Sequence, residues 1–187
     1  MYNRHLKTLF GIWVALISIA VAGCSKDMNG SIYQSQLPKF DLADYFDGTI
    51  KAWGIVQDRS GQVVNRFDAD IEAFRDGDTI VLDEVFRYYD PKQAVGQPTK
   101  RVWRIEQNAR GYSGTAGDIL GQARGTSYGN ALQWTYDMAL PVNGSTYRVR
   151  FDDWIWAMND DVIINRSYIK KFGITWAEVT IFMQKQK

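Results

Sequence analysis

Acidic side chains interrupt apolar segments of this chain, and carboxyl groups in apolar surroundings are suited to acid–base chemistry. Glu84 alternates with Ile80, Leu82 and Phe86, so the four share one face if the segment is a strand. A lone buried carboxylate is costly unless it is paired or hydrogen-bonded, so Glu84 needs a cationic or donor partner, or a wet cavity. Two interpretations stay open: a polar anchor in a ligand cavity, or a structural ion pair on a half-buried face.

A second acidic segment contains the adjacent residues Asp152 and Asp153. Consecutive strand residues point to opposite faces, so these two carboxylates do not converge on a metal ion or on one proton. Pairing with the next segment would bring Asp153 within reach of Arg166. An enzyme built on this chain would draw on Glu84, Asp153, Arg166 and Lys171, and it would need them together in one concave site. We expect no enzyme.

Aromatic residues make up 14% of the chain, which contains seven tryptophans. Six of these lie in alternating segments, where they could line a barrel and present N–H donors to an apolar ligand. The alternative is simple core packing. The candidate ligand-binding residues are Trp53, Glu84, Arg87, Trp103, Trp154, Trp156 and Arg166.

The N-terminus places the only cysteine of the chain directly after an apolar run. Arg4 and Lys7 precede the run Leu9–Gly23, and Cys24 follows it. A basic start followed by an apolar core too short to span a bilayer is typical of a secretory signal peptide. The ending Val-Ala-Gly-Cys resembles the lipobox at which signal peptidase II cuts lipoproteins. We expect cleavage between Gly23 and Cys24, with a membrane-anchoring lipid such as palmitate on Cys24.

Cleavage would remove the only histidine, His5, while the lipid would consume the only thiol. The mature chain would therefore lack the residues for Ser-His-Asp or Cys-His catalysis, for zinc sites with His or Cys ligands, and for disulfides. Loss of Arg4 and Lys7 leaves a charge near neutral, which gives no electrostatic basis for binding nucleic acid. We expect no metal and no cofactor.

The domain organisation follows from composition and periodicity. Residues 1–23 are the signal peptide, polar residues 24–38 predict a lipidated flexible tether, and 39–187 form one domain. Within it, period-2 alternation between turn signals predicts strands, with a short helical turn near 41–45. The predicted strands are 48–57, 64–75, 78–90, 99–108, 110–117, 121–128, 131–141, 145–158, 161–170 and 174–185.

This pattern predicts an all-β fold. An up-and-down sheet hides its edges most simply by closing, so we expect an antiparallel barrel of about 8–10 strands. A two-sheet sandwich, which implies no cavity, is the alternative.

Several segments resemble a family of small bacterial lipoproteins with no assigned function. They include Ala52-Trp53-Gly54, Phe151-Asp-Asp-Trp154, and Asn165-Arg-Ser followed by Lys171-Phe-Gly173. The resemblance implies a lipocalin-like (calycin) barrel, although Gly48 lies farther from Trp53 than in the lipocalin Gly-x-Trp motif. The family has no established catalytic residues, so the resemblance implies none for this chain. Ser25 after the anchor resembles the outer-membrane sorting signal of enterobacterial lipoproteins.

The sequence therefore predicts a lipoprotein that faces the periplasm from the outer membrane. Its expected function is the non-enzymatic binding of a lipid or another apolar small molecule inside the barrel. The alternative is a structural or protein-interaction lipoprotein of the envelope without a cavity, which predicts a contiguous exposed apolar patch.

Overall fold

The computed structural model describes residues 28–89, 99–142 and 144–187. The predicted signal peptide, its cleavage site and Cys24 lie outside these ranges. The described chain forms ten strands and two short helices, the 3₁₀ helix η1 (Gly30–Tyr33) and α2 (Leu42–Tyr45). The strands are β1 (Gly48–Asp58), β2 (Val63–Asp76), β3 (Thr79–Tyr88), β4 (Thr99–Asn108), β5 (Gly111–Thr115), β6 (Ile119–Tyr128), β7 (Ala131–Val142), β8 (Ser145–Ala157), β9 (Val162–Lys171) and β10 (Ile174–Lys185).

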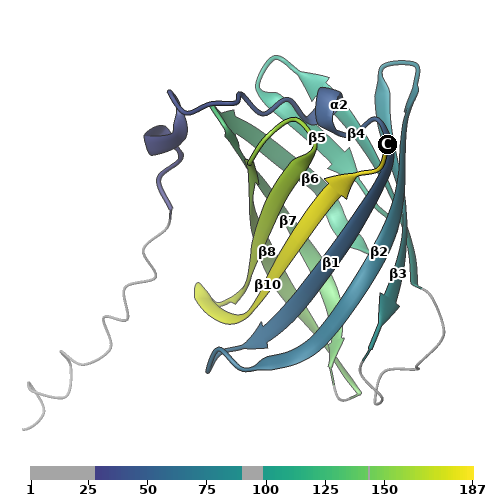
Figure 1. Cartoon of the computed structure of the whole chain (residues 1–187). Coiled ribbons are helices and arrows are strands. Elements are labelled where there is room, and N and C mark those ends of the chain that lie inside the picture. The colour runs from purple at the N-terminus through teal and green to yellow at the C-terminus, as the bar shows by residue number, and fades with distance from the viewer. Residues whose placement is uncertain (1–27, 90–98, 143) are drawn as a thin grey trace, which may run out of the picture.

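The strands form one closed antiparallel barrel (Figure 1). Each strand pairs with its neighbours in the chain, and β10 closes the ring by pairing with β1 from Ile50 opposite Lys185 to Asp58 opposite Ala177. The prediction of an all-β up-and-down barrel is confirmed. Period-2 alternation located the strands well because one face of each is buried against a shared interior.

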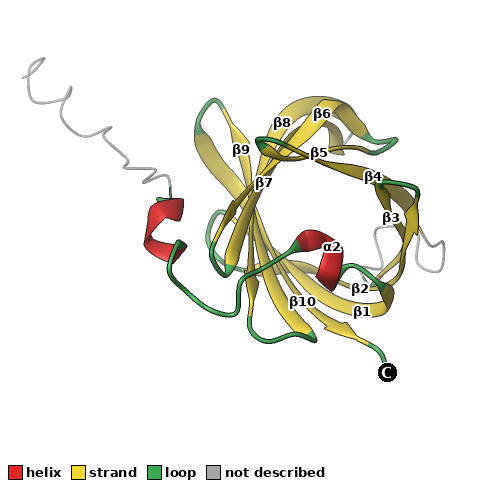
Figure 2. Ribbon diagram, turned by 90° about the horizontal axis from the view of Figure 1, so that it is seen from above, coloured by secondary structure: helices red, strands yellow, loops and turns green. Residues whose placement is uncertain are grey.

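The two ends of the barrel differ. The upper end in Figure 1 carries the tight turns after β2, β4, β6 and β8, and α2 lies across it, as the view from above shows (Figure 2). Asp41 starts α2 by accepting hydrogen bonds from the backbone N–H groups of Ala43 at 2.8 Å and Asp44 at 3.3 Å. Tyr45 is buried and its hydroxyl donates to the Met183 carbonyl at 3.1 Å. The helix therefore covers one side of this end of the barrel.

The segment before α2 packs on the outer wall of the barrel. The Tyr33 ring lies 5.9 Å from the Trp154 ring and 6.1 Å from the Trp156 ring, measured between centroids. Gly30 is buried against the Tyr128 ring, where a β-carbon would lie only 2.5 Å from the ring atoms. Trp154 points outward and is nevertheless only 1% exposed.

These contacts correct the expectation of a flexible tether (24–38) for its described residues, 28–38. Residues 30–33 form a helix on the barrel wall, and Phe40 donates its N–H to the Gly129 carbonyl at 2.8 Å. The polar composition of the segment gave no sign that it packs on the barrel. The packing depends on only two contacts, made by the Gly30 backbone and the Tyr33 ring. Within the described ranges, no helix has the length and hydropathy needed to cross a membrane.

Candidate functional site

Strand alternation decides which candidate residues face the interior. On β3, Glu84 lies on the buried inner face with Ile80 and Leu82, as predicted. On β4, Arg101 and Trp103 occupy the same inner face, and Arg101 stands directly opposite Glu84 in the β3–β4 register. The interior of the barrel is therefore apolar with charged groups built into it.

An aromatic cluster fills one side of the interior. The ring centroid of Trp103 lies 5.6 Å from that of Trp134 and 5.3 Å from that of Tyr136, and Tyr136 stacks on Phe151 at 4.9 Å. Gly125 makes room for the Trp134 indole, because a β-carbon there would lie 2.6 Å from it. Large rings on β4, β7 and β8 thus require a small residue on the intervening strand β6.

Solvent reaches the interior from the lower end. Near α2, the inward-facing side chains of Ile50, Ile80, Leu132 and Ile163 have no exposed surface. Toward the opposite end, inward-facing side chains are only half-buried although they lie on the same faces; they include Phe86, Ile119, Leu140 and Ala177. Among the described residues, the inward-facing side chains are therefore covered at the upper end and partly exposed toward the lower end.

Between these two zones, polar side chains from five strands face the interior, and all are buried except the half-buried Arg101. We call Glu84, Arg101, Tyr136, Asp153 and Ser167 the interior polar cluster. Arg101 donates from Nε and Nη2 to Asp118 in the β5–β6 connection, at 2.8 and 2.5 Å. Asp153 stands opposite Ser167 in the β8–β9 register.

The two carboxyl groups of this cluster are incompletely paired. Glu84 and Asp153 are each 8% exposed. In the described part of the chain, Oε2 of Glu84 and Oδ1 of Asp153 have no hydrogen-bond partner. Native proteins rarely leave buried polar atoms without a partner, so each such atom calls for an explanation such as a bound group.

Burial controls the protonation of both carboxyl groups. It raises the pKa of Glu84 to about 7, with the Arg101 charge opposing the shift. It also raises the pKa of Asp153 to about 7, where the Ser167 side chain and Arg101 act in the opposite direction. Near neutral pH each group can therefore either donate or accept a hydrogen bond.

The structure divides the seven candidate ligand-binding residues between the two faces. Glu84 and Trp103 lie inside the barrel, whereas the remaining five side chains lie on the outer wall: Trp53, Arg87, Trp154, Trp156 and Arg166. Five of the seven candidates therefore do not line the interior of the barrel. Sequence alternation defines two faces of each strand, but it does not relate the faces of different strands to each other.

The predicted pairing of Asp153 with Arg166 is also wrong. The register places Arg166 opposite Trp154, so its side chain lies on the outer wall, where Nε donates to Glu178 at 3.0 Å. Asp153 points inward on the other side of the sheet. The four acid–base candidates of the sequence therefore do not share one site.

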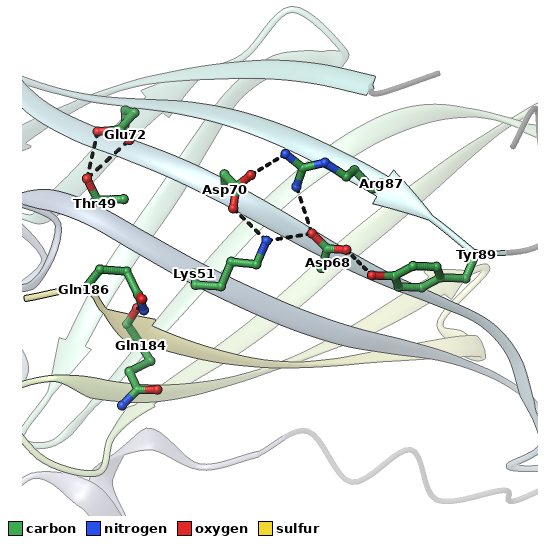
Figure 3. A network of polar contacts seen from close by, with 9 residues as sticks. All are labelled: Thr49, Lys51, Asp68, Asp70, Glu72, Arg87, Tyr89, Gln184 and Gln186. Carbon is green, nitrogen blue, oxygen red and sulfur yellow. Dashed lines mark hydrogen bonds and ion pairs between the residues drawn. The ribbon is translucent and has the colours of Figure 1, made fainter. Parts of the chain in front are cut away.

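Arg87 belongs to an ion-pair network on the outer wall (Figure 3). Asp68 Oδ1 lies 2.8 Å from both Lys51 Nζ and Arg87 Nη1, and Asp70 also contacts both cations. Tyr89 donates its hydroxyl to Asp68. Burial alone would raise the pKa of Asp68, but Lys51, Tyr89 and Arg87 outweigh it and lower the pKa to about 2. The network cross-links β1, β2 and β3, and its charges are already paired.

Sequence reasoning missed Arg101 and Tyr136 as site residues. The signal for Arg101 was its alternation with Trp103 and Ile105, which places a cation on an apolar face. Tyr136 was recognised as a member of an alternating segment, but nothing in the sequence showed which polar groups stand across the barrel from it.

A separate groove of about 550 Å³ lies over β5 and β6, lined by residues that include Arg110, Ser113 and Arg124. Both arginines are exposed. In the described ranges, no group of three or more His, Cys, Asp or Glu side chains could hold a metal ion. We take the interior polar cluster as the candidate site because it holds buried carboxyl oxygens that have no partner in the described chain.

Comparisons with known proteins bear on the fold. A family model described as "Protein of unknown function (DUF3833)" matches residues 18–185. None of the curated proteins matches the chain.

Two solved structures resemble the barrel. The S-type phycobiliprotein lyase CPES from Guillardia theta is 10% identical, with a TM-score of 0.56 over 78% of this chain and 91% of that chain. A protein of unknown function from the DUF3598 family of Nostoc punctiforme is 8% identical, with a TM-score of 0.53 over 81% of this chain and 51% of that chain. At these identities the likeness establishes the lipocalin-like barrel fold alone.

Proposed function

We propose that this chain, a member of the DUF3833 family of proteins of unknown function, binds a small molecule inside its barrel. The ligand is largely apolar and carries a polar group. Its apolar part occupies the accessible lower half of the interior, and its polar group meets the interior polar cluster.

The observation that carries this proposal is the pair of unpartnered carboxyl oxygens of Glu84 and Asp153. Both atoms lie within an interior whose described side chains are covered at the end near α2 and partly exposed toward the other end. A ligand that brings hydrogen-bond donors or a cation to these atoms would remove the penalty of leaving them unpaired. A purely apolar ligand would not.

The fold likeness supports binding in general terms. Barrels of this size can hold one small ligand in their interior. The phycobiliprotein lyase has the same type of barrel, and its name describes a protein that acts on a phycobiliprotein. We carry over only the capacity of such a barrel to take up a small molecule.

The proposed function is binding without catalysis. Of the acid–base candidates, Arg166 and Lys171 lie away from Glu84 and Asp153. Arg101, the cation of the interior, is held by Asp118 at the edge of the barrel. This arrangement offers hydrogen-bonding atoms to a ligand.

Membrane attachment is the second part of the proposal. The Val-Ala-Gly-Cys ending and the short apolar run before it support a lipid on Cys24. Ser25 supports sorting of the lipoprotein to the periplasmic face of the outer membrane. The barrel would then work at a membrane surface, where apolar small molecules are concentrated.

The test is the recovery of a small molecule from the purified full-length protein. Organic extraction followed by mass spectrometry should find one compound in near-stoichiometric amount. We expect Glu84→Gln and Asp153→Asn to lower its recovery at least tenfold, because the amides change the donors and acceptors without changing side-chain size. Glu178→Gln on the outer wall is the matched control and should retain the compound. Equal recovery from all variants, or no compound from any, would contradict the proposal.

A further inference from the structure

Exposed apolar side chains surround the lower opening of the barrel. Each of the four lower hairpins whose turns are largely described contributes at least one. We call these six residues the apolar rim: Val63, Leu120, Val142, Tyr147, Phe172 and Ile174. Large exposed apolar groups gathered at one end of a barrel mark an interaction surface.

The turns of the upper end differ in composition. Its described turns consist mainly of polar residues and glycine, including Gly77-Asp78 and Gly129-Asn130, and Met158 is the one large apolar side chain exposed in them. The lower turns are therefore the more apolar ones, although Ile32, Leu37 and Phe74 are also exposed beside the upper end.

Phe172 is the most exposed member of the rim, at 89%. It has a φ of +52°, and the following Gly173 has a φ of +75°. Two positive φ values in a two-residue hairpin are typical of a type I′ turn, whose first position favours Asn, Asp or Gly. A bulky residue with positive φ is a genuine outlier. Its full exposure in a strained position indicates that the ring serves a contact outside the barrel.

Cations lie among the rim residues. Lys171 Nζ is 4.0 Å from the centroid of the Tyr147 ring, and in the described part of the chain no acidic group forms an ion pair with it. On the neighbouring hairpin, Arg148 and Arg150 share the single carboxylate of Asp137, at 2.7 and 3.0 Å. Apolar side chains interspersed with excess positive charge match an anionic lipid surface.

The start of the described chain places the predicted anchor within reach of the same surface. Met28 Sδ lies 4.0 Å from the Tyr168 hydroxyl on β9. Phe172 is four residues beyond Tyr168, about 13 Å along a strand. Cys24 is four residues before Met28, and four residues of chain span up to about 14 Å. A lipid on Cys24 can therefore enter the same bilayer that the rim would contact.

We propose that the apolar rim docks the open end of the barrel onto an anionic lipid bilayer, so that the interior opens directly onto the membrane that holds the anchor. This inference rests on the proposed function and deepens it. The ligand is then a membrane component that enters from the bilayer, with its polar group directed to the interior polar cluster.

The test measures which parts of the lipidated full-length protein contact lipid. Single variants Phe172→Cys, Val142→Cys and Met158→Cys are labelled with the environment-sensitive dye NBD, since Cys24 is blocked by its lipid. Each is bound to vesicles of phosphatidylethanolamine and phosphatidylglycerol that contain a doxyl-labelled phospholipid. We expect doxyl quenching at 172 and 142, on two different hairpins, to be at least threefold stronger than at 158, and soluble iodide to quench mainly the label at 158.

A second comparison uses charge. Phe172→Asp in the Val142→Cys background should reduce doxyl quenching at 142 by more than half, whereas Met158→Asp should leave it unchanged. Equal quenching at the three positions, iodide access to all three, or failure of the chain to float with the vesicles would overturn the inference. A rim that binds a protein partner instead would give iodide access at 172 and 142. The ligand-recovery experiment decides the proposed function separately, because it does not depend on the rim.

Discussion

At the scale of single residues, the buried carboxyl groups have the clearest consequence. Glu84 keeps its side chain inside the barrel, its pKa is raised to about 7, and one of its oxygens lacks a partner in the described chain. The unfolded chain would release this proton near pH 4.5, the ordinary value for the group. Folding stability therefore depends on pH.

The direction of this dependence follows from the raised pKa. Because the folded state retains the proton more strongly, the contribution of Glu84 to stability is fully present below about pH 4.5 and is lost as the pH rises to about 7. We expect Glu84→Gln to match the wild type at pH 4.5 and to exceed its free energy of unfolding by up to about 3 kcal/mol at pH 8. Urea unfolding at both pH values measures this. Glu178→Gln should keep the wild-type dependence, and the same pH profile in both variants would contradict the assignment.

Phe172 provides a second prediction, because its backbone conformation disfavours its side chain. We expect Phe172→Asn to raise the free energy of unfolding by about 1 kcal/mol, since Asn tolerates the left-handed region. Phe172→Leu keeps the strain and should show no gain. The same Asn variant should lose lipid contact if the rim docks on a membrane. A variant that is less stable than the wild type would show that the ring supports the fold.

At the scale of elements, the N-terminal segment acts as an external cover for β8. Tyr33 from this segment covers Trp154, which is buried although it faces outward. We expect Tyr33→Ala to lower the free energy of unfolding by about 1–3 kcal/mol through lost apolar contact. It should also shift tryptophan emission to longer wavelength as Trp154 meets water. Ile32→Ala, at an exposed position of the same turn, is the control and should change neither.

The strands were predictable from the sequence because period-2 burial is local. Glu84, for example, was placed correctly with Ile80 and Leu82 on one face. What could not be predicted was which faces meet across the barrel. Arg166 and Trp154 were assigned to the site although both lie outside, while Arg101 and Tyr136 were missed, because the register between strands depends on the whole closed sheet.

At the scale of the whole molecule, the barrel is polarised from end to end. The upper end combines α2, tight polar turns and fully buried side chains, and the lower end combines an accessible interior with exposed apolar residues. Halfway between them lies the interior polar cluster. A ligand that enters from below would meet apolar walls first and the carboxyl groups last, so the barrel would select for molecules with a polar group at the leading end.

The pairing of β1 with β10 has a consequence for how the chain reaches this state. The other nine pairings join strands that follow each other, so each can form as soon as the second strand has been made. The pairing of β1 with β10 is the one that cannot form until the last strand is present. Until then, β1 presents an unpaired edge, which is a template for intermolecular association. The vulnerable interval of this protein is therefore the time between the emergence of β1 and the arrival of β10, when a chaperone would have the most to protect.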